Sequence, residues 1–304
     1  VAAAQDVQMG GYAETRSVGS VGTKGLNHLI YEIVDNSVDE HLAGACSQIR
    51  VTLEADGSCT VRDNGRGIPV EMHKKGMAAE RIVLSTLHAG GKFDNNAYKT
   101  SGGLHGVGSS VVNALSAHLE VNVYKNGQIH HDAYERGIPT VELIDGLLPV
   151  VGKTRETGTE INFLPDPEIF EETVYDFEIL RIRLQETAFL TKGLRILLKD
   201  DREEKREKVF HYEGGIQEFV TYLNKGKVPL YSDVIYCEGT KDGVFVEVAM
   251  QHNDSYTESI YSFVNNVNTP EGGTHLAGLK NALTKTINDY ARKNKLLKDS
   301  EPNL

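Results

Sequence analysis

Four polar side chains recur at every fourth position in one otherwise largely apolar segment. They are His28, Glu32, Asn36 and Glu40, and residues four apart lie on one face of a helix. The Asn36 amide oxygen is a hard, uncharged ligand of the kind that Mg²⁺ takes together with phosphate oxygens and water. A carboxylate one turn earlier, Glu32, can accept a proton from an attacking water, and His28 can orient it. The series is typical of a site that hydrolyses a metal-bound phosphate ester.

Glu40 poses a separate problem, because the helical projection places it within the apolar stripe of the segment. A buried carboxylate without a partner costs several kcal/mol, so we expect Glu40 to form an ion pair, with Arg66 as a candidate. A cluster of acids on a helix surface would account for Glu40 in this way. It would leave the pairing of Glu32 with Asn36 unexplained.

Two glycine-containing loops follow this helix. The first, DNGRGIP (63–69), comes after a short strand-like run, and its glycines let the backbone approach a ligand closely. Asp63, at the end of that run, can accept a hydrogen bond from an exocyclic amine such as that of adenine. A turn capped by the same aspartate is an equally good interpretation of this stretch taken alone.

The second loop, SGGLHGVGSS (101–110), runs directly into a helical pattern. Backbone N–H groups at such a junction bind anions. The loop is not a Walker A motif, because it lacks GK[ST], and it is not a Rossmann fingerprint, because it follows a long loop instead of a strand. The chain carries a net charge of -11, so a triphosphate here would need backbone donors and Mg²⁺ to offset the repulsion.

The hydrophobic pattern predicts the elements that must hold these residues. Helical spacing covers 23–42, with Thr23 as a plausible N-cap, and alternation predicts a hairpin from 49–54 and 59–63. Further helices are predicted over 78–88, from 107 onward and over 177–190, and further strands within 119–165 and over 194–199. A second unit is predicted to begin near 211–216, with a short helix and strands over 244–251 and 259–265. It ends in a helix that has Leu276, Leu279, Leu283 and Ile287 on one face. The first unit would be an α+β fold, a two-layer α/β sandwich with helices on one face of a mostly antiparallel sheet.

Composition limits the class of protein. A length of 304 residues indicates two domains, and the acidic net charge gives no general attraction to DNA or anionic lipid. The three cysteines have no paired spacing and indicate free thiols in a reducing compartment. No apolar run approaches the roughly 20 residues of a membrane span, and the first residues do not have the pattern of a signal peptide. We expect a soluble, cytoplasmic protein that does not contact a membrane.

The motifs taken together are much more specific than any one of them. EIVDN, DNGRGIP, LHAGGKF and SGGLHGVG, in this order, resemble the GHKL superfamily of ATPases, which includes gyrase, heat-shock chaperones, histidine kinases and MutL. LHAGGKF, SGGLHGVGSSVVNALS, TGTEINF, FHYEGGI and EGGTHLAG look like the N-terminal ATPase region of bacterial DNA gyrase B, over roughly residues 20 to 304. The ATPase subunit of topoisomerase IV is the nearest alternative, and a histidine-kinase catalytic domain or a MutL-like nucleotide switch are more distant ones.

The resemblance implies a role for each matching position. Glu32 would be the general base for water attack on the γ-phosphate, supported by His28, and Asn36 would bind Mg²⁺. Asp63 would bind adenine. The other positions implied to contact the nucleotide are Glu40 and Arg66 as an ion pair at the pocket mouth, Gly67, Ile68, Pro69 and Thr159 near the base, Lys92 and Tyr98 in a lid, and Gly102, Gly103, Leu104, His105, Gly106, Val107 and Gly108 at the phosphates. Apolar walls would come from Ile33, Val61, Ile68, Val83 and Ile161.

The resemblance also implies an organisation and a mechanism. Residues 1–22 would be an N-terminal arm, 23–212 the GHKL ATP-binding domain and 213–304 a smaller α/β transducer domain that is incomplete at its C-terminus. ATP and Mg²⁺ would be the cofactors. ATP binding would let two copies of the chain dimerise and close a gate around DNA, and hydrolysis would reopen it. With DNA gyrase A as partner, the holoenzyme would supercoil DNA negatively.

Three departures from the family pattern carry expectations of their own. ETRSVGS (14–20) stands where the family has Arg-Pro-Gly-Met-Tyr-Ile-Gly, so we expect altered dimerisation. The sequence ends at EPNL (301–304), before the Gln-Thr-Lys loop that supplies a γ-phosphate lysine, so we expect ATP binding with poor hydrolysis. His131 stands near where gyrases often place an arginine that lines the aminocoumarin pocket, so we expect weaker binding of that drug class.

Overall fold

The computed structural model describes residues 22–86, 108–298 and 300–304. The chain divides into two compact units between Asp254 and Ser255. Among the described residues, none of the helices combines the length and the apolar character that crossing a membrane requires.

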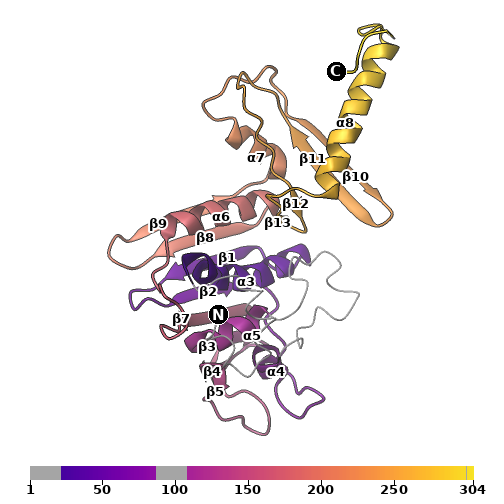
Figure 1. Ribbon diagram of the computed structural model, residues 1–304. Coiled ribbons are helices and arrows are strands. Elements are labelled where there is room, and N and C mark those ends of the chain that lie inside the picture. The colour runs from indigo at the N-terminus through magenta and orange to yellow at the C-terminus, as the bar shows by residue number, and fades with distance from the viewer. Residues whose placement is uncertain (1–21, 87–107, 299) are drawn as a thin grey trace. The chain divides into compact units, whose positions relative to one another are not determined.

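One large sheet organises the first unit (Figure 1). Its main strand order is β5-β4-β3-β7-β2-β1-β8-β9, and β6 pairs with β4. The strands are β1 (Gln48–Leu53), β2 (Cys59–Asp63), β3 (Ser116–Lys125), β4 (Gln128–Glu135), β5 (Ile138–Pro139), β6 (Val150–Lys153), β7 (Gly158–Pro165), β8 (Arg195–Asp200) and β9 (Arg206–His211). The β1–β8 pair is parallel and the other pairs are antiparallel, which confirms the expected mostly antiparallel sheet.

Tight turns explain why the middle strands follow one another so closely. Asn126 and Gly127, between β3 and β4, have φ of 54° and 77°, and Arg136 and Gly137, between β4 and β5, have φ of 49° and 79°. Two consecutive left-handed residues are typical of the two-residue hairpin turn whose twist matches that of the strands.

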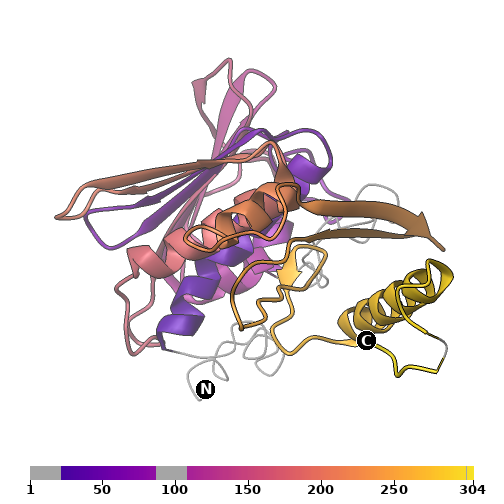
Figure 2. The same ribbon diagram turned by 90° about the horizontal axis from the view of Figure 1, so that it is seen from above.

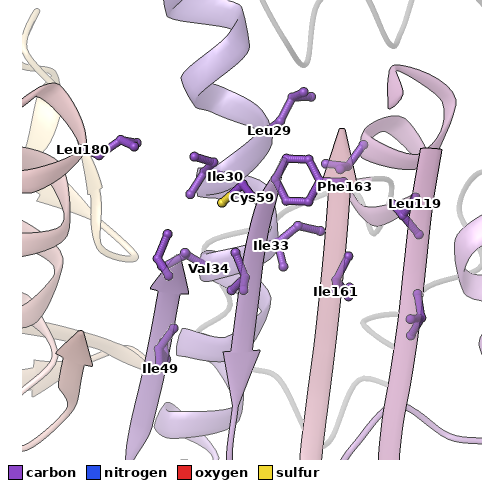
Figure 3. Packing of buried hydrophobic residues seen from close by; sticks show 14 of the residues in the cluster. Leu29, Ile30, Ile33, Val34, Ile49, Cys59, Leu119, Ile161, Phe163 and Leu180 are labelled. Carbon is purple, nitrogen blue, oxygen red and sulfur yellow. The ribbon is translucent and has the colours of Figure 1, made fainter. Parts of the chain in front are cut away.

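Helices α3 (Thr23–Leu42), α5 (Gly108–Ala114) and α6 (Phe177–Leu190) cover one face of this sheet, as Figure 2 shows. Leucine, isoleucine and valine side chains of α3 are buried at intervals of three and four residues, as the sequence predicts. Figure 3 shows Ile33 on the side of Ile161 of β7, and Ile30 and Val34 on the side of Cys59 of β2 and Ile49 of β1, all in one buried cluster. The result is the predicted two-layer α/β sandwich.

Some element boundaries differ from those predicted. Thr23 is the first residue of α3 and not its N-cap, because Gly22 occupies that position and makes no side-chain capping bond. Helix α4 (Ala79–Ser85) begins one residue later than predicted, and positions 87 and 88 lie outside the described residues. Helix α5 ends at Ala114, since β3 begins at Ser116.

The chain beyond β9 continues the first unit. Helix α7 (Gly215–Leu223) packs on α6 through Phe219, whose ring centroid lies 4.9 Å from that of Phe189. Tyr212, between β9 and α7, stacks on the same Phe189 ring at 3.6 Å. A separate ribbon follows, formed by β10 (Ile235–Lys241) and β11 (Val244–Met250), and the latter confirms the predicted strand over 244–251.

The second unit contains the short strands β12 (Phe263–Val264) and β13 (Val267–Asn268) and the helix α8 (Thr274–Lys293). The terminal helix was predicted correctly. The prediction of a strand over 259–265 was wrong for most of its length, because only Phe263 and Val264 pair. Asn265 and Asn266 have positive φ of 49° and 65° and turn the chain back at once.

A buried charged cluster joins α4 to β4. Arg81 donates to both carboxylate oxygens of Asp132 at 3.0 and 2.6 Å, and Tyr134 Oη donates to Asp132 Oδ2 at 2.7 Å. Glu80 is fully buried beside them, and its Oε2 atom makes no hydrogen bond to any part of the chain that the structure describes. One arginine cannot balance two carboxylates, so burial and then Asp132 raise the pKa of Glu80 well above its usual value.

Glu80→Gln is expected to flatten the pH dependence of the free energy of unfolding. Because the pKa of Glu80 is raised in the folded state, its stabilising contribution is complete below the unfolded-state pKa of about 4.3 and is lost as pH rises through the folded-state pKa, by at most about 1.4 kcal/mol per pH unit. Urea unfolding between pH 5 and 8 measures this. Glu135→Gln, at an exposed position of β4, is the control. Parallel pH curves for wild type and Glu80→Gln would contradict a protonated Glu80.

Candidate functional site

His28 and Glu32 meet on α3 as their spacing predicts. The His28 Nε2 atom lies 3.1 Å from Glu32 Oε1. This hydrogen bond raises the pKa of His28, while partial burial acts in the opposite direction. The two side chains remain 37% and 24% exposed, so water can reach the carboxylate. The pair therefore provides an oriented base in contact with solvent.

The glycine-rich loop enters the site at the start of α5. Gly108, the first residue of α5, packs so closely on Glu32 that a Cβ at this position would overlap Glu32 Oε2. The next residue, Ser109, accepts a hydrogen bond of 3.0 Å from Asn36 Nδ2. Because the amide nitrogen is the donor, Asn36 Oδ1 is the atom suited to a hard cation such as Mg²⁺. Side chains of α3 and the backbone of α5 thus form one edge of the site.

Asp63 ends β2 and is buried, with 8% of its surface exposed. Its Oδ1 atom accepts hydrogen bonds from the backbone N–H groups of Gly65 at 2.8 Å and Thr159 at 3.3 Å, and its Oδ2 atom accepts from Ser37 Oγ at 2.9 Å. Burial raises the pKa of Asp63, and the three donors oppose this by stabilising the carboxylate. Each carboxylate oxygen can take two donors, so Oδ2 retains capacity for one more, such as an exocyclic amine.

The first glycine loop is fixed by β3 and β7. Ile68 N donates to Thr159 Oγ1 at 3.1 Å, and Gly67 O accepts from Lys125 Nζ at 3.3 Å. Gly67 has φ of 78°, and a Cβ there would lie 3.1 Å from Gly158 O. Glycine is therefore required at position 67 by both conformation and space.

The expected ion pair between Glu40 and Arg66 is present. Arg66 Nε donates to Glu40 Oε2 at 2.9 Å and Arg66 Nη2 donates to Glu40 Oε1 at 2.8 Å, a two-point contact. The arginine side chain is 53% exposed, so the pair stabilises the fold by at most about 1 kcal/mol. Its main consequence is to tie the first glycine loop to α3.

The five expected wall residues divide into two groups. Ile33, Val61 and Ile161 are buried in the core between helices and sheet, whereas Ile68 and Val83 are half-buried. Pro69, the last residue of the first glycine loop, is exposed. The remaining expected residues fall outside the described part of the chain: Lys92, Tyr98, Gly102, Gly103, Leu104, His105, Gly106 and Val107.

No group of three or more histidine, cysteine, aspartate or glutamate side chains suited to a metal occurs among the described residues. A Mg²⁺ ion held by one amide oxygen, phosphate oxygens and water does not need such a group. The donor set around Asn36 therefore fits Mg²⁺ bound together with a polyphosphate.

Three polar residues of the site were not found from the sequence: Ser37, Ser109 and Lys125. Ser37 follows Ile33 by four residues and therefore lies in the apolar stripe of α3, and a polar residue in such a stripe indicates a buried hydrogen bond. That signal was available for Ser37. The partners of Ser109 and Lys125 are distant in sequence, and no local pattern identifies them.

Two protein families match separate parts of the chain. Residues 22–168 match the family described as histidine kinase-, DNA gyrase B-, and HSP90-like ATPase, and residues 215–304 match the family described as DNA gyrase B.

Curated relatives are similar over nearly the whole chain. The DNA gyrase B protein of Halalkalibacterium halodurans is 54% identical over 94% of this chain and 45% of the relative, and that of Streptococcus pyogenes is 53% identical over 94% and 44%. The chain therefore spans less than half the length of these relatives. Among solved structures, the 43K ATPase domain of Thermus thermophilus gyrase B, in complex with an aminocoumarin, superposes with a TM-score of 0.81 at 38% identity, covering 96% of this chain and 75% of that one.

Proposed function

The chain belongs to the DNA gyrase B family and corresponds to the ATPase region of that family. On that premise we propose that the site on α3 binds ATP with Mg²⁺ and hydrolyses it. One observation carries this proposal. Two neighbouring residues of α3 connect the two glycine loops, because Asn36 bonds to Ser109 and Ser37 bonds to Asp63. The residue proposed to accept adenine and the loop proposed to bind phosphate are thus bonded to adjacent positions of α3.

Each side chain has a distinct task in this mechanism. Asp63 accepts a hydrogen bond from the exocyclic amine of adenine. The hydrogen bond between Thr159 and Ile68 holds the first glycine loop beside the base. Glu32 takes the proton of the attacking water, and His28 holds the carboxylate in position. Asn36 Oδ1 would bind Mg²⁺, which when present supplies positive charge that offsets the charge of the phosphates.

The other expected site residues enter the proposal with their implied roles. The Glu40–Arg66 pair would flank the pocket mouth, with Gly67 and Pro69 near the base and Gly108 near the phosphates. Contacts from positions outside the described residues remain predictions, namely those of Lys92, Tyr98, Gly102, Gly103, Leu104, His105, Gly106 and Val107.

We further propose the domain limits and the larger assembly. Residues 1–22 would form an arm, 23–212 the ATP-binding domain and 213–304 a transducer domain. The start of the DNA gyrase B family match at residue 215 supports a boundary near residue 212. In the whole protein, ATP would drive dimerisation and closure of a gate around DNA, with DNA gyrase A as partner and negative supercoiling as the result. Binding energy would shift the population of closed dimers, and hydrolysis would reset it.

A comparison of ATP with inosine triphosphate tests the assignment of Asp63. Inosine has a carbonyl oxygen where adenine has its amine, so a carboxylate there faces an acceptor instead of a donor. We expect inosine triphosphate to bind about 10- to 100-fold more weakly than ATP, the range for one hydrogen bond to a charged group. Equal dissociation constants by calorimetry would overturn the proposed adenine contact.

His131→Arg is expected to strengthen aminocoumarin binding by about tenfold, the value of one charge-assisted hydrogen bond. The His131 imidazole Nδ1 atom lies 3.0 Å from Asn122 Oδ1 on the adjacent strand β3. An arginine at position 131 could therefore donate one hydrogen bond to the Asn122 side-chain carbonyl and keep its other N–H groups for the ligand. Fluorescence or calorimetric titration measures the affinity. His118→Arg, elsewhere on the sheet, is the control. An unchanged affinity in His131→Arg would contradict this role.

A further inference from the structure

A cation on α6 contacts the helix that carries the proposed general base. The Arg183 guanidinium lies over the ring of Tyr31, 5.7 Å from its centroid. The Tyr31 ring in turn meets the His28 imidazole edge to face, at 6.2 Å between centroids and 88° between planes. His28 is the residue bonded to Glu32. A continuous series of contacts therefore runs from α6 to Glu32, and the roles proposed above for the nucleotide site involve neither Arg183 nor Tyr31.

The pKa of His28 is raised overall, chiefly by its hydrogen bond to Glu32, while charges on two helices act on it in opposite directions. Glu32 and Asp35, both on α3, favour the protonated imidazole, whereas burial and Arg183 from α6 oppose it. Tyr31 stays uncharged at neutral pH, because burial raises its pKa to about 12. Glu186, one turn along α6, lies 3.8 Å from Arg183 and is its ion-pair partner. Arg183 therefore limits, but does not reverse, the rise in the pKa of His28.

The protonation of His28 matters to Glu32. A neutral imidazole donates one N–H to the carboxylate and leaves the charge of Glu32 available to accept a proton from water. An imidazolium would form a full ion pair with Glu32 and make it a weaker base. A cation that limits the protonation of His28 therefore keeps Glu32 reactive at lower pH.

We propose that Arg183 is a positioning residue for ATP hydrolysis: acting through Tyr31, it holds the His28 ring in place against Glu32 and, as a nearby cation, limits its protonation. This inference rests on the proposed role of Glu32 as general base. Arg183 itself does not touch the nucleotide. It sets the state of the residue that orients the base, from a helix that packs on α7 and so lies next to the segment that matches the DNA gyrase B family.

Arg183→Gln tests the proposal, with Arg183→Lys to restore the charge and Arg181→Gln as a matched control. Arg181 lies two residues away on the same helix and instead contacts Glu178 and Gln185. The His28 resonance is identified by its loss in His28→Asn, and its titration is followed by NMR without nucleotide. ATP turnover is then measured from pH 6 to 9, together with the thermal stability of each variant.

In Arg183→Gln the His28 titration should move to higher pH, and ATP turnover should fall roughly 3- to 10-fold at pH 6.5 while staying near wild type at pH 9. Arg183→Lys and Arg181→Gln should leave both profiles in place. An unmoved His28 titration in Arg183→Gln overturns the proposal. The proposal is also overturned if Arg183→Gln and Arg183→Lys both lose the same fraction of turnover at every pH, because that pattern indicates a role in packing alone. Failure of the general-base role would appear separately, as full turnover in Glu32→Gln.

Discussion

Glu32→Gln is expected to reduce ATP hydrolysis by about 10²- to 10⁴-fold while ATP still binds. The substitution keeps the shape of the side chain and removes only its ability to take a proton, and general-base contributions are of this size. Binding is expected to persist because the adenine contact at Asp63 and the Asn36–Ser109 edge do not involve the Glu32 carboxylate. A change in turnover with little change in affinity identifies a group that acts in the transition state.

Phosphate release measures the turnover of Glu32→Gln, and calorimetry measures its affinity for ATP. Glu207→Gln, at an exposed position of β9, removes a carboxylate of the same type elsewhere and serves as control. Turnover in Glu32→Gln within a few-fold of wild type would show that another group activates the water.

Asp63→Asn is expected to weaken ATP binding by about 100-fold or more. The amide loses the charge that strengthens the contact with the adenine amine, and its own NH₂ group must then face donors from Ser37, Gly65 or Thr159. Because burial raises the pKa of Asp63, wild-type affinity should also fall as pH drops through that pKa and the carboxylate gains a proton.

Asp145→Asn is the control for this substitution. Asp145 lies exposed in a turn with φ of 51°, a conformation that asparagine also adopts readily. Circular dichroism separates lost binding from lost folding. An affinity of Asp63→Asn within about threefold of wild type, with an intact fold, would remove Asp63 from the nucleotide site.

Much of the fold was predictable because long elements bury one periodic face. The spacing of apolar residues predicts that α3, α6 and α8 are helices, and the Asn126-Gly127 pair predicts a hairpin turn. Short elements were not predictable in the same way. Strand β12 ends after two residues because two consecutive asparagines with positive φ follow it. The alternation of apolar residues does not predict that turn. The parallel β1–β8 pairing also joins residues 147 positions apart, such as Gln48 and Arg195.

In the candidate site, too, local contacts could be predicted from the sequence and contacts between distant segments could not. The His28–Glu32 contact and the Glu40–Arg66 pair could be inferred, the first from helical spacing and the second from the cost of burying a charge. The contact of Ser109 with Asn36 depends on how α5 packs on α3. The approach of Arg183 to Tyr31 likewise depends on how α6 packs on α3. The two residues are 152 positions apart, and no local sequence pattern predicts their contact.

Calorimetric titration of a non-hydrolysable ATP analogue, with and without Mg²⁺, into wild type and Asn36→Ala tests the nucleotide site most directly. Wild type should bind about tenfold or more tightly with Mg²⁺ than without it, the value of a charge-assisted contact. Asn36→Ala should lose that gain and keep the Mg²⁺-independent affinity. If Mg²⁺ strengthens binding equally in both proteins, the cation and the phosphates lie elsewhere, and the α3 site is not where ATP is hydrolysed.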